Sequence, residues 1–149
     1  MKLLICGATG FIGNEVLEQC IAHNYVEKIV CITRRQLDRK YAMHDKVTQI
    51  IHEDFADYPD YVLEKLASYK PEGCIWAVGK RAMADYKSKD EAERVWIHYP
   101  VQAAEHFARA LATKLDPRAD PRKFKFPFRF VWMSGRLCLG MLLNEKVAC

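Results

Sequence analysis

The chain of 149 residues and 17.3 kDa is 50% apolar, which suits one domain with a core of its own over residues 1–149. Its formal net charge of +4 is mild and its basic residues are dispersed, apart from Arg34-Arg35 and the stretch from Arg118 to Lys125, so no nucleic-acid-binding surface is indicated. No apolar run approaches the ~20 residues of a membrane span. The six cysteines include no C-x-x-C pair, so we expect reduced thiols and no metal site, in a cytoplasmic protein.

The first two dozen residues carry the most informative pattern of the chain. Lys2–Cys6 is an apolar run that predicts a strand, glycines follow at positions 7, 10 and 13, and apolar residues at helical spacing come next. A second apolar run at 28–33 completes a strand, helix and strand unit. Gly7 would permit a sharp turn, Gly10 a close approach of backbone N–H groups to a pyrophosphate, and Gly13 close packing of the helix on the strand. The pattern predicts a nucleotide-binding turn, with a purely structural turn as the alternative.

The spacing Gly-x-x-Gly-x-x-Gly, in the wording Gly7-Ala8-Thr9-Gly10-Phe11-Ile12-Gly13, resembles the NAD(P)-binding turn of the extended and atypical short-chain dehydrogenase/reductases. The resemblance implies an α/β fold of Rossmann type, a doubly wound parallel sheet of about five strands in the order 3-2-1-4-5 between two helical layers. It also implies a nicotinamide dinucleotide bound by the turn. The residues that it assigns to this role are Gly7, Thr9, Gly10, Phe11, Ile12 and Gly13.

Two arginines, Arg34 and Arg35, follow the predicted second strand. In this fold an acid at that position binds the 2′-hydroxyl of NAD, whereas arginine accommodates the 2′-phosphate of NADP. No carboxylate follows along the chain until Asp38. We therefore expect NADP(H) to be preferred and NAD(H) to be the weaker cofactor; a solvated basic loop is the alternative.

A third strand is predicted at Val47–Ile51, and Pro59 then opens a helix that runs through Leu66. Between them, Asp54 and Phe55 match the family positions that contact the adenine, although Asp54 is equally well explained as an acid before a helix. The helix contains Tyr61 and Lys65 at the Tyr-x-x-x-Lys spacing of dehydrogenase active sites. We reject this pair because it precedes the fourth strand and should face away from the nicotinamide.

The fourth strand is predicted at 74–79, and the resemblance places Ala77, Val78 and Gly79 beside the ribose and pyrophosphate of the cofactor. A long helix is predicted from about Asp90 to Leu115, with a kink or a true start at Pro100.

The fifth strand and its exit are predicted at 129–135, where Ser134 matches the serine that orients the substrate carbonyl in relatives. Without the resemblance, a Ser-Gly turn would be the default explanation. The general acid of these reductases is a tyrosine on the next helix, and no tyrosine follows Ser134. The resemblance therefore implies a chain truncated after the fifth strand.

Two functions follow from these observations. One is an NADP(H)-dependent oxidoreductase acting on a carbonyl or alcohol; the alternative is a catalytically incompetent cofactor-binding or regulatory module. A sheet that ends at its fifth strand leaves an unpaired edge, which predicts a homo-oligomer or a protein partner there, or a gene product that folds poorly.

Overall fold

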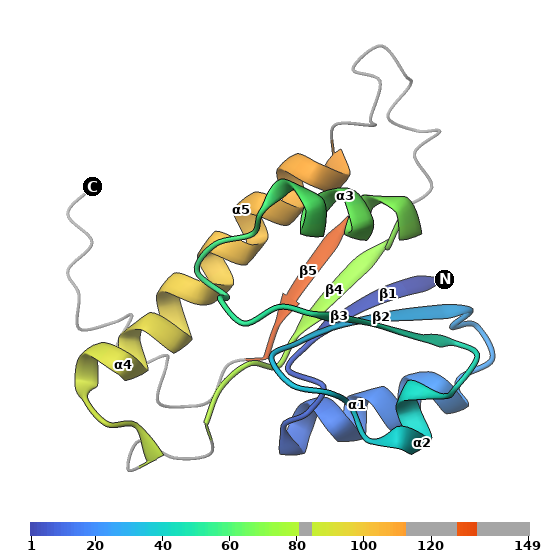
Figure 1. The fold of residues 1–149 in the computed structure, drawn as a ribbon, viewed down its shortest axis with the longest axis horizontal. Coiled ribbons are helices and arrows are strands. Elements are labelled where there is room, and N and C mark those ends of the chain that lie inside the picture. Colours follow the sequence, from blue (N-terminus) through green and yellow to red (C-terminus); the bar gives the residue numbers. More distant parts are fainter. Residues whose placement is uncertain (81–84, 113–127, 134–149) are drawn as a thin grey trace.

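Five parallel strands form one sheet in the order β3-β2-β1-β4-β5, as the sequence predicted. The structure is a computed structural model that describes residues 1–80, 85–112 and 128–133. The strands are β1 (Lys2–Cys6), β2 (Lys28–Thr33), β3 (Val47–Ile51), β4 (Gly73–Trp76) and β5 (Arg129–Trp132). Because all five run in the same direction, their carboxyl ends meet at one edge of the sheet (Figure 1).

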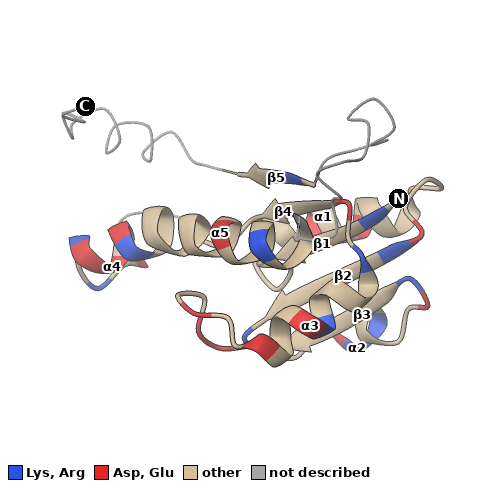
Figure 2. Ribbon diagram, turned by 90° about the horizontal axis from the view of Figure 1, so that it is seen from above, with Lys and Arg blue, Asp and Glu red and all other residues tan. Residues whose placement is uncertain are grey.

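Helices cover both faces of the sheet, so the fold has three layers (Figure 1). They are α1 (Phe11–Ala22), α2 (Arg39–Ala42), α3 (Asp60–Tyr69), α4 (Lys89–Glu93), the π-helical turn η2 (Arg94–His98) and α5 (Tyr99–Ala112). In Figure 1, α1 and α2 lie below the sheet, and α3 and α5 lie above it. Figure 2 shows both signs of charge on α3, α4 and α5, so no one of these helices is uniformly basic or acidic.

The central strand β1 supplies side chains to two separate cores. Leu4 and Cys6 belong to the core under α3 and α5, whereas Leu3 and Ile5 belong to the core over α1 and α2. Alternate residues of a strand point to opposite faces, and both faces are covered here, so nearly every residue of β1 is apolar. This burial explains why β1 and β2 were predictable from apolar runs alone.

The helix predicted from about Asp90 to Leu115 is helical without a break from Lys89 to Ala112, in three successive segments, α4, η2 and α5; its predicted end at Leu115 lies outside the described residues. The backbone N–H of Tyr99 bonds to the carbonyl of Arg94, five residues earlier, which defines the π-helical turn. Pro100 comes directly after this turn. A proline ring inside a regular helix collides with the carbonyl four residues before it, and the wider π turn relieves that collision.

Other boundaries differ by a few residues. β4 ends at Trp76, three residues before the predicted end of the fourth strand, although the N–H of Ala77 still donates to the carbonyl of Cys6 at 2.8 Å. α3 extends to Tyr69 and stops where Lys70 adopts a left-handed conformation, with φ of 53°.

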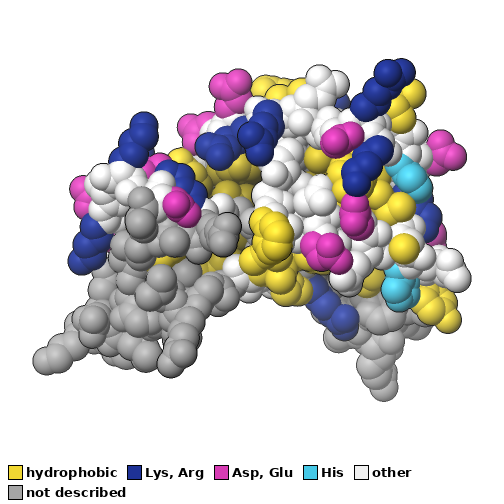
Figure 3. Space-filling view, turned by 90° about the horizontal axis from the view of Figure 1, so that it is seen from below, with side chains coloured by type: hydrophobic (Ala, Val, Ile, Leu, Met, Phe, Trp, Pro, Cys, Tyr) yellow, Lys and Arg dark blue, Asp and Glu magenta, His cyan; other side chains and the backbone are white. Residues whose placement is uncertain are grey.

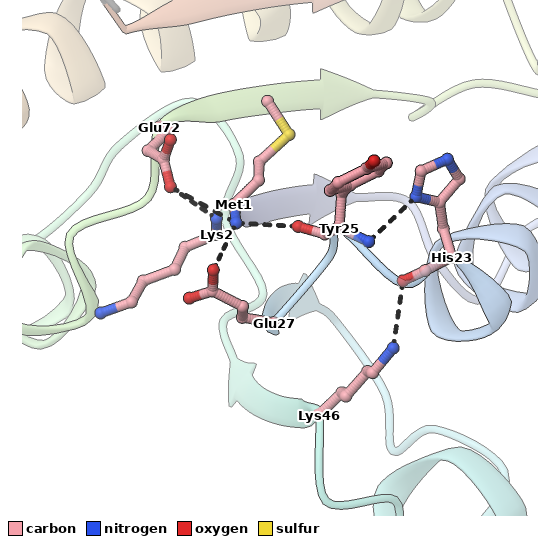
Figure 4. A network of polar contacts seen from close by, with 7 residues as sticks. All are labelled: Met1, Lys2, His23, Tyr25, Glu27, Lys46 and Glu72. Atoms are coloured by element: carbon pink, nitrogen blue, oxygen red, sulfur yellow. Dashed lines mark hydrogen bonds and ion pairs between the residues drawn. The ribbon is translucent and has the colours of Figure 1, made fainter. Parts of the chain in front are cut away.

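Polar contacts connect the amino ends of the strands, opposite the edge where the carboxyl ends meet (Figure 4). The amino group of Met1 donates to the carbonyl of Tyr25 at 2.8 Å and to the carboxylate of Glu27 at 3.0 Å. The backbone N–H of Lys2 donates to the carboxylate of Glu72 at 2.8 Å. This network fixes the starts of β1, β2 and β4 relative to one another.

Cys6, Cys31 and Cys74 are buried and unpaired, as expected for reduced strand residues. Burial raises the pKa of the Cys31 thiol to about 12, so the thiolate does not form at neutral pH. Within residues 1–80, 85–112 and 128–133, no helix has the length and apolar character to cross a membrane. The same residues contain no group of three or more potential metal ligands.

Candidate functional site

The turn between β1 and α1 depends on two glycines. Gly7 has a φ of +90°, a conformation that L side chains rarely adopt, and a Cβ there would lie 2.6 Å from the carbonyl group of Ala77. A Cβ at Gly13 would lie 2.1 Å from the carbonyl oxygen of Gly7. Gly7 therefore lets the turn pass close to the exit of β4, and Gly13 lets α1 pack on the turn.

Gly10 has a different role from its two neighbours. Its φ of −88° and ψ of 168° suit any residue, and a Cβ there would meet only the carbonyl oxygen of Gly7, at 3.3 Å. Gly10 is the N-cap of α1, and among the described residues no side chain caps this helix and no acid lies in its first turn. The first N–H groups of a helix have no partner inside it, so this end of α1 can receive an anion.

A cleft of about 480 Å³ opens at the carboxyl edge of the sheet, beside this turn. It is lined by residues from the glycine turn, the exits of β2 and β4, and the segment after β3. These residues are Gly7, Thr9, Gly10, Thr33, Arg34, Arg35, Glu53, Phe55, Ala77, Val78 and Gly79. Nine of the residues predicted to bind the cofactor are thus brought together in one place.

The exit of β2 is tied to the glycine turn across the cleft. The Nη2 atom of Arg35 donates to the carbonyl oxygen of Thr9 at 3.3 Å, and both arginines are exposed. Thr33, at the end of β2, is buried and also lines the cleft. Figure 3 shows basic, acidic and hydrophobic side chains interspersed over the described surface that is visible on the lower side of the molecule.

The segment after β3 contributes a carboxylate that the sequence analysis overlooked. Glu53 lines the same cleft as the two arginines, whereas the sequence analysis considered only the carboxylates that follow the arginines directly along the chain, of which Asp38 is the first. Asp54 is outside the cleft lining, and its Oδ1 atom accepts from the backbone N–H of Ala56 at 2.8 Å. Phe55 lines the cleft and is buried, and its ring packs edge-on against that of Trp76, with the two ring centroids 5.6 Å apart.

The far end of the cleft, at Gly79, is bordered by an aromatic cluster. A Cβ at Gly79 would lie 3.8 Å from the hydroxyl of Tyr86 and 3.9 Å from the indole nitrogen of Trp96. The Tyr86 hydroxyl accepts from the backbone N–H of Lys80 at 2.7 Å, and the Lys80 ammonium lies 4.8 Å from the centre of the Tyr86 ring. Lys80 also pairs with Glu91 at 2.8 Å, which fixes this cluster against α4.

Several predicted residues lie elsewhere. Phe11 and Ile12 begin α1 with exposed side chains, and Gly13 is buried; none of the three lines the cleft. Tyr61 is exposed on α3, and neither it nor Lys65 belongs to the cleft lining. Ser134 lies outside the described residues.

Within the described chain, two buried polar side-chain atoms have no hydrogen-bond partner: the hydroxyl of Tyr58 and the indole nitrogen of Trp76. Burial raises the pKa of the Tyr58 hydroxyl far above its usual range, so this group stays protonated. Neither residue could be singled out from the sequence, because residue type alone does not show whether a buried polar atom finds a partner.

Comparison with known proteins gives a family and a fold. Residues 3–115 match the NAD dependent epimerase/dehydratase family. No curated protein sequence matches the chain significantly.

Three solved structures share the fold at low identity. The enzyme WbmG of Bordetella bronchiseptica, in complex with NAD, is 20% identical, with a TM-score of 0.54 over 74% of this chain and 34% of that one. Yeast methylglyoxal/isovaleraldehyde reductase Gre2, complexed with NADPH, is 15% identical, with a TM-score of 0.63 over 75% and 34%. Uronate dehydrogenase from Agrobacterium tumefaciens is 19% identical, with a TM-score of 0.58 over 90% and 40%. The chain thus covers between a third and two fifths of the length of these three proteins.

Proposed function

Because the chain belongs to the NAD dependent epimerase/dehydratase family, we propose that its cleft binds a nicotinamide dinucleotide, with the pyrophosphate at the start of α1. The observation that carries this proposal is the uncapped end of α1 at Gly10, next to a turn that Gly7 and Gly13 hold compact. Backbone N–H groups at such an end attract phosphate oxygens. The absence of an acid from the first turn of α1 leaves the site open to an anion.

We further propose that NADP(H) is preferred over NAD(H). Arg34 and Arg35 line the cleft where β2 ends, the place at which dinucleotide folds contact the adenosine ribose. A guanidinium forms charge-assisted hydrogen bonds to phosphate and is always protonated. Glu53 lies in the same cleft and works against this preference, since its carboxylate repels a 2′-phosphate.

A bound nicotinamide supplies hydride transfer, so the first candidate role is an oxidoreductase acting on a carbonyl or alcohol. In this role the chain's own residues bind and orient the two reactants along the cleft. The second candidate is a cofactor-binding module without catalysis. It is favoured by the cleft lining, which within the described residues contains no tyrosine and no lysine.

The test is a titration of NADPH and NADH against the wild-type chain and the double variant Arg34→Ala/Arg35→Ala. An arginine–phosphate contact contributes about 1.5–3 kcal/mol, so NADPH affinity should fall about tenfold or more while NADH affinity changes little. Arg39→Ala, on the exposed first residue of α2, is the matched control and should leave both affinities unchanged. Equal affinity of the wild type for the two cofactors would refute the preference, and no affinity for either would refute the proposed function.

A further inference from the structure

One side chain of β3 holds the loop that carries the two arginines. The Nε2 atom of Gln49 donates to the Oγ1 atom of Thr33 at 2.5 Å and to the carbonyl oxygen of Arg35 at 2.9 Å. Its Oε1 atom accepts from the backbone N–H of Leu37 at 3.3 Å. A single amide therefore bonds to three residues within the five-residue segment from Thr33 to Leu37.

The orientation of this amide is determined by its partners. A carbonyl can only accept and a backbone N–H can only donate, so the bonds to Arg35 and Leu37 fix which end of the Gln49 amide is nitrogen. Both N–H groups of that nitrogen are used. A carboxylate of the same shape would place an acceptor oxygen against the Arg35 carbonyl, and an apolar side chain would make none of the three bonds.

The segment from Thr33 to Leu37 is bonded both to β3 and to the glycine turn. Thr33 and Leu37, at its two ends, are buried, whereas Arg34 and Arg35 between them are exposed. The backbone of Arg35 is bonded to Gln49 of β3, and its guanidinium is bonded to Thr9 of the glycine turn. These bonds hold the backbone in place around Arg34 and Arg35, the two residues whose side chains must reach a ligand.

We propose that Gln49 is a positioning residue that sets the preference of the cleft for a 2′-phosphorylated dinucleotide. It acts through the backbone of the segment from Thr33 to Leu37, by holding Arg34 and Arg35 at the ribose end of the cleft. Gln49 is not among the residues that line the cleft, so its proposed effect is transmitted through the segment that it holds. The inference rests on the proposed function, because it concerns how that cofactor site distinguishes its ligands.

The experiment measures dissociation constants for NADPH and NADH with Gln49→Ala. NADPH affinity should fall about fivefold to tenfold, as expected for loss of ordered hydrogen bonds, and NADH affinity should stay within about twofold. A purely structural role would lower both affinities together. Gln36→Ala changes an exposed glutamine of the same segment and should alter neither affinity.

A double-variant cycle adds a second readout. In the Arg34→Ala/Arg35→Ala background, Gln49→Ala should cause no further loss of NADPH affinity, because the groups that it positions are gone. An equal loss in both backgrounds would overturn the proposal, as would equal losses for the two cofactors in the wild-type background or no loss at all.

Gln49→Met keeps the volume of the side chain and is included in case the alanine variant unfolds. Unfolding of both variants, seen by circular dichroism, would show that the amide holds the fold rather than the preference and would overturn the proposal. If the wild-type chain bound neither cofactor, the proposed function itself would fail, and this outcome is distinct from those above.

Discussion

Gly13 and the carbonyl oxygen of Gly7 are in such close contact that a methyl group on Gly13 would lie 2.1 Å from that oxygen. The contact joins the first turn of α1 to the end of β1 and brings the start of the helix over the cleft. Gly10 lies between these two glycines but has ordinary backbone angles, and a Cβ there would need only a small shift of one neighbour, the carbonyl oxygen of Gly7 at 3.3 Å. The three glycines of one motif therefore differ in what they do, and substitution should separate their roles.

Gly13→Ala should destabilise the protein whether or not a ligand is present. A separation of 2.1 Å cannot be accommodated without moving the backbone of either Gly7 or α1. We expect the free energy of unfolding to fall by about 3 kcal/mol, the upper end of typical overpacking costs. Urea denaturation followed by circular dichroism measures this change. An unchanged midpoint would show that α1 does not pack on the turn as described.

Gly10→Val, in contrast to Gly13→Ala, should leave the fold intact and abolish cofactor binding. Its backbone conformation suits valine, and its nearest obstacle is one carbonyl oxygen at 3.3 Å. The branched side chain would instead occupy the space proposed for the pyrophosphate. Binding of NADPH and NADH should become undetectable while the circular dichroism spectrum stays native. Normal binding by a folded variant would place the nucleotide site elsewhere.

Glu53→Gln should strengthen NADPH binding. The substitution removes a negative charge from the cleft that contains Arg34 and Arg35, and an interaction between two solvent-screened charges is worth up to about 1 kcal/mol, or roughly fivefold in affinity. NADH, which lacks the 2′-phosphate, should gain much less.

Asp54→Asn is the matched control for this change, since Asp54 is adjacent but outside the cleft lining and its amide analogue can still accept from Ala56. Unchanged affinities are expected. A loss of affinity for both cofactors in Asp54→Asn would instead support the family assignment of this residue to the adenine. A gain in NADPH affinity equal to that of Glu53→Gln would show that the effect is not specific to the cleft.

The strands and the glycine turn could be predicted because short-range patterns determine them. Residues 28–33 and 47–51 were placed to the residue, since a parallel strand buried on both faces requires an apolar run. Glu53 was overlooked because it lies between two other polar residues, His52 and Asp54. Which of them turns toward the cleft depends on the path of the chain after β3, and no periodicity encodes that path.

The hydrogen bonds of Gln49 to the segment from Thr33 to Leu37, and the π-helical turn η2, could not be predicted from the sequence either. A glutamine in a strand gives no sign that its amide reaches the backbone of the neighbouring chain segment. In the same way, the apolar residues before Pro100 are as compatible with a regular α-helix as with a helix that contains a π-helical turn at Arg94–His98. Both features arise from contacts between segments or from backbone geometry rather than from residue type.

Catalytic turnover by this chain should be very slow. Reduction of a ketone requires a proton donor, and general-acid catalysis typically contributes about 10²–10⁴-fold to the rate. The described cleft lining contains no tyrosine, and Tyr86 borders only its end at Gly79. A screen of aldehydes and ketones with NADPH, followed by nicotinamide absorbance, should give rates far below about 1 s⁻¹. Faster turnover would contradict this expectation, and its loss in Tyr86→Phe, with Tyr99→Phe as the control, would identify Tyr86 as the proton donor.

The central place of β1 in the sheet also has a consequence for how the chain folds during synthesis. β1 is made well before β4, one of its two partner strands, and the bonded pair Lys2 and Glu72 are 70 positions apart. At ~5–20 residues per second, the ribosome needs roughly 4–14 seconds to make that interval. During this time one edge of an apolar strand has no partner and is open to pairing with other chains. The yield of soluble protein should therefore depend on chaperone supply and on expression temperature more than the thermodynamic stability of the finished fold would suggest.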